Sequence, residues 1–203
     1  MFRRIPVALA ILMMSGTTAG AEDNDYERSG PYIGAAGTWA LYTSAENRLE
    51  EDLPSAKVDN PLGVNGRAGY RMNSFFAAEV EFEWLAESNV ESSGLGVAGL
   101  DTWSVTANAK GFILTRLMHD LGIARLQPFA LAGVGLMRSK IDDKADLDLS
   151  AKNQDFAVRV GAGLDLYITR NILGSLEVGW VLPTQGLRDL DYVSFSWGLQ
   201  YRF

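Results

Sequence analysis

The chain has 203 residues, of which 47% are hydrophobic, and its mean hydropathy is zero. This content excludes a disordered chain, and the absence of cysteine excludes a disulfide scaffold, a Cys-ligated zinc site and a thiol nucleophile. The net charge of −7 argues against nucleic-acid binding, and a single histidine leaves little room for histidine-based catalysis, so we expect no nucleic acid, no metal and no cofactor.

The first 21 residues have the layout of a secretory signal peptide. Arg3 and Arg4 precede a short apolar run over residues 5–14, and small residues follow as far as Ala21. The apolar run is too short for a helical membrane span, which needs about 20 residues. We therefore expect a cleaved signal peptide over residues 1–21 and one domain over residues 22–203, with a retained N-terminal anchor as the alternative.

Apolar and polar residues alternate along most of the remaining chain. This period of two predicts β-strands, because successive side chains of a strand point to opposite faces. The expected strands cover residues 31–43, 62–72, 75–87, 102–115, 127–139, 155–168, 172–183 and 191–203. They exceed the roughly 5–6 residues usual in soluble strands and suit tilted strands that cross a bilayer. The first and fifth are apolar or small on both faces, so their orientation stays open.

Short and long connections alternate between these strands. The short connections, which define the turn side, are residues 73–74, 116–126 and 169–171. The long connections, which define the loop side, are residues 44–61, 88–101, 140–154 and 184–190. This layout is typical of an outer-membrane barrel with its long loops outside the cell, and an even strand count places both termini in the periplasm. The alternation of Ala145, Leu147 and Leu149 further predicts that strands extend beyond the membrane, with a bulge near residues 152–154.

Charge and aromatic residues support this topology. The loop-side segments carry a net charge of −8 over residues 44–61, 87–101, 139–154 and 184–191. Aromatic residues near the strand ends are expected to form two girdles at the membrane interfaces. They are Trp39, Tyr42, Trp84, Trp103 and Tyr192 on the loop side, and Tyr70, Phe76, Tyr201 and Phe203 on the turn side. The alternative is a soluble, lipocalin-like barrel with its apolar face inward.

The final segment, VSFSWGLQYRF, resembles the C-terminal strand of bacterial outer-membrane proteins. The segments PYIGAAGTWALY, NGRAGYRM, FFAAEVEFEW and PFALAGVGLM likewise resemble the outer-membrane β-barrel domain family, the small barrels that include the OmpA transmembrane domain, OmpX and the opacity proteins. The resemblance implies an all-β, eight-stranded antiparallel up-and-down transmembrane β-barrel in the outer membrane of a Gram-negative bacterium, in contact with outer-membrane lipid and lipopolysaccharide. It also implies an assembly signal for the barrel-assembly machinery at Phe195, Trp197, Leu199, Tyr201 and Phe203.

Several charged residues fall on strand faces that are expected to point into the barrel. A short turn over residues 73–75 would place Arg67 opposite Glu81 and Asn65 opposite Glu83. We interpret the charges as a plug that fills the lumen; the alternative is a gated ion path. This expected lumen charge network consists of Arg67, Arg71, Glu79, Glu81, Glu83, Lys110, Arg159, Asp165 and Glu177.

The sequence favours a non-enzymatic barrel over two alternatives. The first interpretation is a protein that contributes to envelope integrity or to adhesion, with an extracellular protein as the candidate ligand of its acidic loops. The second is a narrow porin-like channel for ions or small solutes. The third, a lipid A-modifying enzyme, is least favoured, because a Ser-His enzyme would need its histidine on the loop side and His119 is expected on the periplasmic side.

Overall fold

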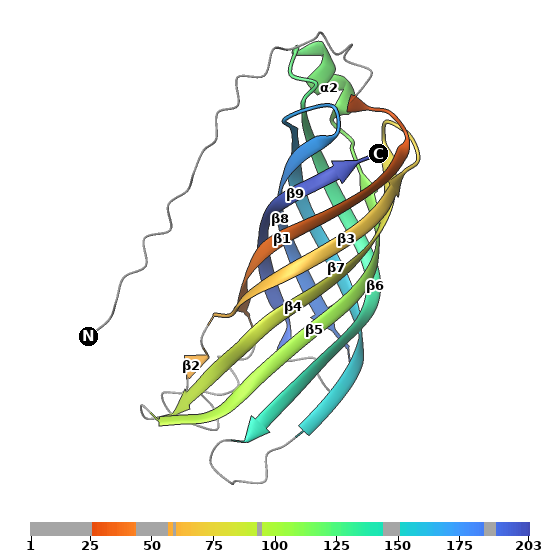
Figure 1. The fold of residues 1–203 in the computed structure, drawn as a ribbon. Helices are drawn as coiled ribbons and strands as arrows, with labels where there is room; N and C mark the ends of the chain where they lie inside the picture. Colours follow the sequence, from red (N-terminus) through yellow and green to blue (C-terminus); the bar gives the residue numbers. More distant parts are fainter. Residues whose placement is uncertain (1–25, 44–56, 59, 93–94, 144–150, 185–189) are drawn as a thin grey trace, which may run out of the picture.

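The computed structural model describes residues 26–43, 57–58, 60–92, 95–143, 151–184 and 190–203, and the expected signal peptide lies outside them. Each long strand pairs antiparallel with its neighbours in the chain, and the last pairs with the first, so the sheet closes into an up-and-down barrel (Figure 1). A short strand, β2 (Lys57–Val58), adds to the edge of one long strand. The eight long strands are β1 (Gly30–Tyr42), β3 (Leu62–Arg71), β4 (Phe76–Ser92), β5 (Leu95–Gly111), β6 (Leu126–Asp143), β7 (Ala151–Tyr167), β8 (Ile172–Pro183) and β9 (Tyr192–Arg202).

All eight expected strands are present, but four of them are longer on the loop side than expected. The expected loop over residues 88–101 is wrong, because β4 and β5 continue their ladder as far as Ser92 and Leu95. β6 and β7 also run past their expected ends and pair as far as Ile141 and Ala151, whereas residues 145–149, on which the expected extension rested, lie outside the described residues. The loop-side end of the barrel is therefore uneven (Figure 1).

Bulges occur in a different strand pair from the one expected. The pairing of β6 with β7 keeps one register throughout, so the bulge expected near residues 152–154 is wrong. That expectation assumed that the alternation of residues 145–149 continues into β7, but residues 144–150 lie outside the described part of the chain. The pairing of β4 with β5 instead shifts register between Leu85 and Ser88 and between Val90 and Glu91.

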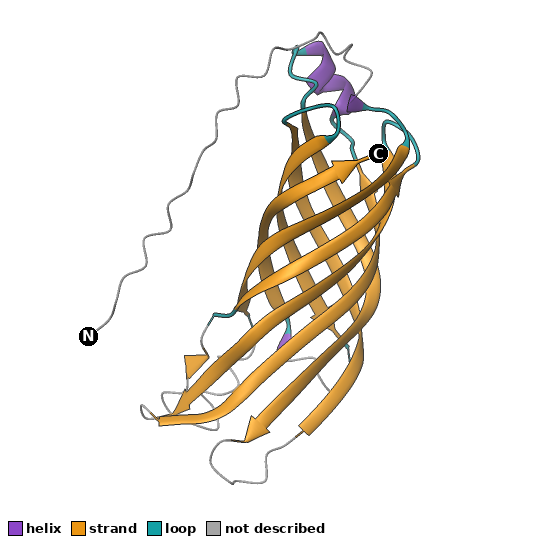
Figure 2. Ribbon diagram, viewed as in Figure 1, coloured by secondary structure: helices purple, strands orange, loops and turns teal. Residues whose placement is uncertain are grey.

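The connection expected over residues 116–126 starts earlier than expected, since β5 ends at Gly111. It contains a short helix, α2 (Thr115–Asp120). The helix lies at the turn-side end of the barrel (Figure 2). Gly122 ends it in the left-handed conformation, with φ of 71°, and donates to the carbonyl of His119 at 2.9 Å. No helix in the described part of the chain is long and apolar enough to cross a membrane.

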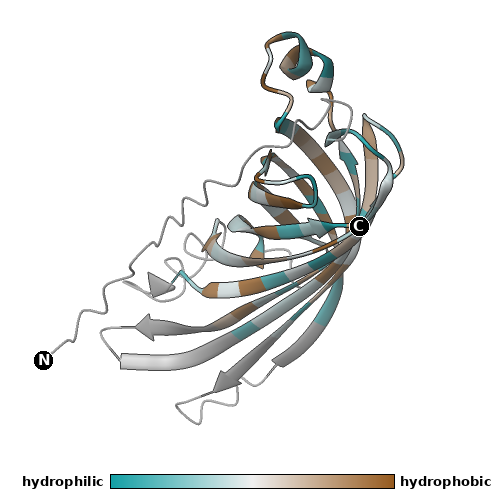
Figure 3. Ribbon diagram, turned by 45° about the horizontal axis from the view of Figure 1, so that its top comes forward, coloured by the Kyte–Doolittle hydropathy of each residue, from teal (hydrophilic) through white to brown (hydrophobic). Residues whose placement is uncertain are grey.

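The two faces of the barrel wall are chemically opposite. Outward side chains are apolar and exposed, as Val80 (53%) and Leu176 (59%) illustrate, whereas the intervening Glu81 and Glu177 are buried. Hydrophobic and hydrophilic bands accordingly alternate along the strands in Figure 3. A lipocalin-like barrel would have the reverse arrangement, so the soluble alternative is wrong. An apolar outer wall over a polar interior suits a barrel surrounded by lipid.

The structure fixes the strands whose orientation the sequence left open. In β1, Tyr32 and Ala40 point inward, while Ile33 and Trp39 are exposed. In β6 up to residue 139, the side chains at odd positions are buried, apart from the glycines at 133 and 135, whereas those at even positions are half-buried or exposed. These strands are apolar on both faces because each contributes aromatic or aliphatic side chains to the interior as well as to the wall.

One part of the expected aromatic girdle is wrong. Trp39 and Trp84 face outward, but Tyr42 and Tyr192 are 7% and 0% exposed and lie inside the barrel. Tyr192 shares the inward parity of Ser194, so the alternation of its own strand accounts for its position.

Candidate functional site

All nine charged residues of the expected network are buried inside the barrel. Each is at most 4% exposed, and they come from five strands of the wall. They fall into two groups, which we call the loop-side charged cluster and the turn-side charged cluster. The loop-side charged cluster consists of Arg67, Glu79, Glu81, Glu83, Arg159 and Glu177. The turn-side charged cluster consists of Arg71, Lys110 and Asp165, together with Arg202.

Arg159 is the centre of the loop-side charged cluster. Its Nη2 atom lies 2.9 Å from Oε1 of Glu81 and 2.9 Å from Oε1 of Glu177, and its Nη1 atom lies 3.7 Å from Oε2 of Glu83. Arg67 contacts Glu177 at 2.7 Å and Glu81 at 3.7 Å. The expected register is present, with Arg67 opposite Glu81, but the shorter contact of Arg67 is made across the barrel to β8. Each arginine thus contacts at least two carboxylates in an interior without exposed surface.

Hydroxyl groups complete this cluster. The Tyr192 hydroxyl donates to Glu83 at 2.7 Å, and the Tyr32 hydroxyl donates to Glu79 at 2.8 Å. Carboxylate oxygens of Glu79, Glu81 and Glu177 lie within 4.8 Å of one another. The guanidinium group of Arg159 already contacts Glu81 and Glu177, so side chains supply positive charge beside these carboxylates.

The turn-side charged cluster is built differently. Lys110 pairs with Asp165 at 3.0 Å and lies 3.5 Å from the ring centroid of Phe129. Arg71 stands apart from the glutamates, because it lies at the turn-side end of β3, where the carbonyls of Asn73 and Ser74 accept from it at 3.0 and 2.8 Å. Uncharged groups therefore satisfy much of this cluster.

Sequence reasoning missed two residues that close the turn side. The Nη1 atom of Arg202 donates to the carbonyl of Tyr26 at 2.9 Å and to the hydroxyl of Tyr167. The rings of Tyr26 and Tyr167 lie 5.1 Å apart. The inward parity of Arg202 along β9 was a usable signal. Tyr26 precedes the first strand, and no pattern in the sequence marks it.

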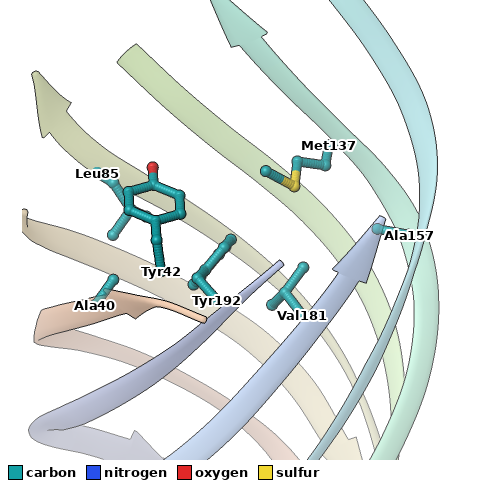
Figure 4. Packing of buried hydrophobic residues seen from close by; sticks show 7 residues of the cluster. All are labelled: Ala40, Tyr42, Leu85, Met137, Ala157, Val181 and Tyr192. Carbon is teal, nitrogen blue, oxygen red and sulfur yellow. The ribbon is translucent and has the colours of Figure 1, made fainter. Parts of the chain in front are cut away.

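Apolar side chains fill the loop-side end of the lumen. Leu85, Met137, Val181 and Tyr192 are each at most 1% exposed and meet in one cluster with Tyr42 (Figure 4). A second cluster surrounds Phe129, whose ring lies where a Cβ atom on Gly163 would overlap it. Inward glycines thus make room for the rings that fill the barrel.

Two other expected features lie outside the lumen. His119 is exposed on α2, at the turn-side end, away from the loop side. The expected assembly-signal residues line the lipid-facing side of β9 and its end, where Phe195 is half-buried and the others are 44–59% exposed. These others are Trp197, Leu199, Tyr201 and Phe203.

Comparisons with known proteins agree with this architecture. The sequence model of the outer membrane protein beta-barrel domain matches residues 7–203. A comparison with curated protein sequences finds no match.

Solved structures share the fold at low sequence identity. The attachment invasion locus protein Ail of Yersinia pestis is 21% identical over 87% of this chain and 99% of its own, with a TM-score of 0.53. Neisserial surface protein A is 15% identical over 87% and 100%, with a TM-score of 0.61. OprG of Pseudomonas aeruginosa is 14% identical over 88% and 98%, with a TM-score of 0.58. Ail has also been solved with the heparin analogue sucrose octasulfate; that structure is 20% identical over 86% and 97%, with a TM-score of 0.51.

Proposed function

We propose that this chain, which belongs to the outer membrane protein β-barrel domain family, is a non-enzymatic surface protein whose filled barrel holds a loop-side interaction surface. The observation that carries the proposal is the contrast between the two parts of the barrel. The lumen is packed with buried side chains, whereas four strands run on past the rest of the wall. Both termini of the barrel domain lie on the periplasmic side in this proposal.

The extended strands form a sheet, and the start of β7 has no strand partner on its β8 side among the described residues. The pairing of β7 with β6 starts at Ala151, but its pairing with β8 starts only at Ala157. On the opposite side of the extension, β2 covers β4 through the pairs Lys57–Glu91 and Val58–Val90. The edge of β7 over residues 151–154 is suited to strand addition by an extended segment of an extracellular protein, whereas the carbonyl of Phe156 already accepts from Thr184 at 2.8 Å.

The charge of the loop-side segments defines the chemistry of this partner. Their net charge of −8 favours a basic protein surface and disfavours polyanions. The name of Ail associates it with attachment, and its ligand sucrose octasulfate is a polyanion. We expect this chain to share a role in attachment and to differ in ligand charge, so that binding weakens as salt rises.

The lumen and the histidine both argue against the alternatives. A channel would need a continuous polar path, but Leu85, Met137, Val181 and Tyr192 belong to a buried apolar cluster at the loop-side end of the lumen. A Ser-His lipid A enzyme would need its histidine among the loops, but His119 lies at the turn-side end.

Adherence of bacteria to a cultured cell monolayer tests this proposal. Cells that express the chain should adhere more than cells without it, and a variant whose β6–β7 hairpin lacks residues 140–154 should lose that gain. The matched control is Leu117→Ala on α2, at the other end of the barrel, which should retain it. Equal adherence of the shortened variant and the full chain, at equal surface amounts, would refute the role of the extension.

A further inference from the structure

A small cavity lies in the turn-side part of the lumen. It leaves about 10 Å³ for the centre of a water-sized molecule, which is roughly the room that one such molecule needs. We call it the turn-side cavity. The polar side chains that line it are Tyr32, Arg71, Lys110, Asp165, Tyr167, Gln200 and Arg202.

The lining of this cavity has an excess of positive charge. Three cationic side chains face one carboxylate, and Asp165 already accepts from Lys110 at 3.0 Å and from Ser175 at 2.7 Å. Arg71 and Arg202, which are 3% and 2% exposed, are met by carbonyls, an amide and a phenol instead of carboxylates. A buried cation without a countercharge is costly, so this site favours a further negative charge.

The cavity also has hydrogen-bond donors without acceptors. The Nε and Nη2 atoms of Arg202 and the Nε2 atom of Gln200 are buried and have no hydrogen-bond partner among the described residues. Both side chains are more than nine-tenths buried and line the cavity. Two residues of the lining thus carry three unpartnered donor atoms, which suits an acceptor that carries charge.

We infer that the turn-side cavity binds one small monovalent anion of the chloride type. Such an ion accepts from all three donors and offsets part of the charge of the two arginines, whereas a water molecule supplies no charge. Sulfate and phosphate are too large for the space. The ion is enclosed as the barrel closes, because Tyr26 and Tyr167 cover this end of the lumen. The inference rests on the barrel interior and is independent of the proposed attachment role.

Unfolding of the refolded barrel in detergent micelles tests the inference. Sodium chloride is exchanged for sodium gluconate at constant ionic strength. The unfolding equilibrium constant should fall as chloride replaces gluconate, and it should fall about tenfold when chloride reaches ten times its dissociation constant. Gln200→Leu removes one donor and should weaken this response. Ser196→Ala, an inward and buried change on the same strand, should retain it.

Diffraction from crystals of protein that was refolded in sodium bromide keeps the inference testable where Gln200→Leu does not fold. An anomalous peak beside Arg202 and Gln200 supports the anion. Identical unfolding in chloride and gluconate, or a cavity without anomalous signal at saturating bromide, would show that it holds water only. An equal loss of the chloride response in Ser196→Ala would assign the response to another part of the protein.

Discussion

The guanidinium of Arg159 on β7 lies 2.9 Å from the carboxylate of Glu81 on β4, although these two strands are not neighbours in the sheet. The same Nη2 atom contacts Glu177 on β8. Side-chain contacts across the lumen therefore join parts of the wall that no backbone ladder joins directly. Because every partner is buried, removal of the arginine leaves three carboxylates without one of their positive charges.

Replacement of Arg159 should destabilise the barrel strongly. We expect Arg159→Met to lower the free energy of unfolding by about 3–5 kcal/mol, the usual cost of breaking a buried ion pair by removing one partner. Arg138→Met is the matched control, since Arg138 is half-buried on the other face of β6. Denaturant titration in detergent measures both variants. Equal losses in the two would contradict the role of the lumen contacts.

The pair of Arg67 and Glu177 should show energetic coupling. Their side chains meet at 2.7 Å from β3 and β8, so Arg67→Met and Glu177→Gln remove the same contact. A double-mutant cycle in the same titration should give a coupling energy of about 0.5–3 kcal/mol, the range for residues in direct contact. Additive losses would mean that the two side chains do not interact in the folded barrel.

Alternation predicted the strands and the inward charges, because a strand places every second residue on the same face. The register of Arg67 with Glu81 followed from the short turn between their strands. Contacts across the barrel did not follow, since they depend on closure and on the lengths of individual side chains. The turn-side contacts of Tyr26 were invisible for the same reason, and Tyr192 was placed in a girdle because its aromatic character outweighed its parity.

Cysteine labelling tests the topology directly, because the natural chain has no cysteine. Ala145→Cys introduces a thiol into the acidic connection between β6 and β7, and Asp120→Cys introduces one at the end of α2. A membrane-impermeant maleimide on intact cells should label the first and not the second. Labelling of Asp120→Cys alone would mean that the barrel has the opposite orientation in the membrane.

The side chain of Phe203 should matter more for assembly than for stability. It is 59% exposed, whereas the backbone N–H of this residue still donates to Pro31 at 3.1 Å, so Phe203→Ala retains the closure of the barrel. We expect less folded protein in the outer membrane and near-normal refolding in detergent. Pulse-chase fractionation beside refolding measures the two effects. Normal membrane amounts would refute an assembly signal at this residue, and failure in both assays would make the effect one of stability.

The polyanion comparison follows from the loop-side charge. A chain with −8 in these segments should give no saturable binding of sucrose octasulfate in nanodiscs, because like charges repel. Calorimetric titration measures this binding, and low salt is used because charge interactions are least screened there. Saturable binding that weakens with salt would contradict the proposed basic partner.

The filled lumen is the central feature of the molecule, and ion conductance across planar bilayers tests it most directly. Folded protein is first identified by its heat-dependent migration in SDS gels and is then inserted into the bilayer. We predict no conductance steps above those of protein-free bilayers, because Leu85, Met137, Val181 and Tyr192 belong to one buried apolar cluster inside the barrel. Reproducible single-channel steps from the folded wild-type chain would contradict a sealed lumen.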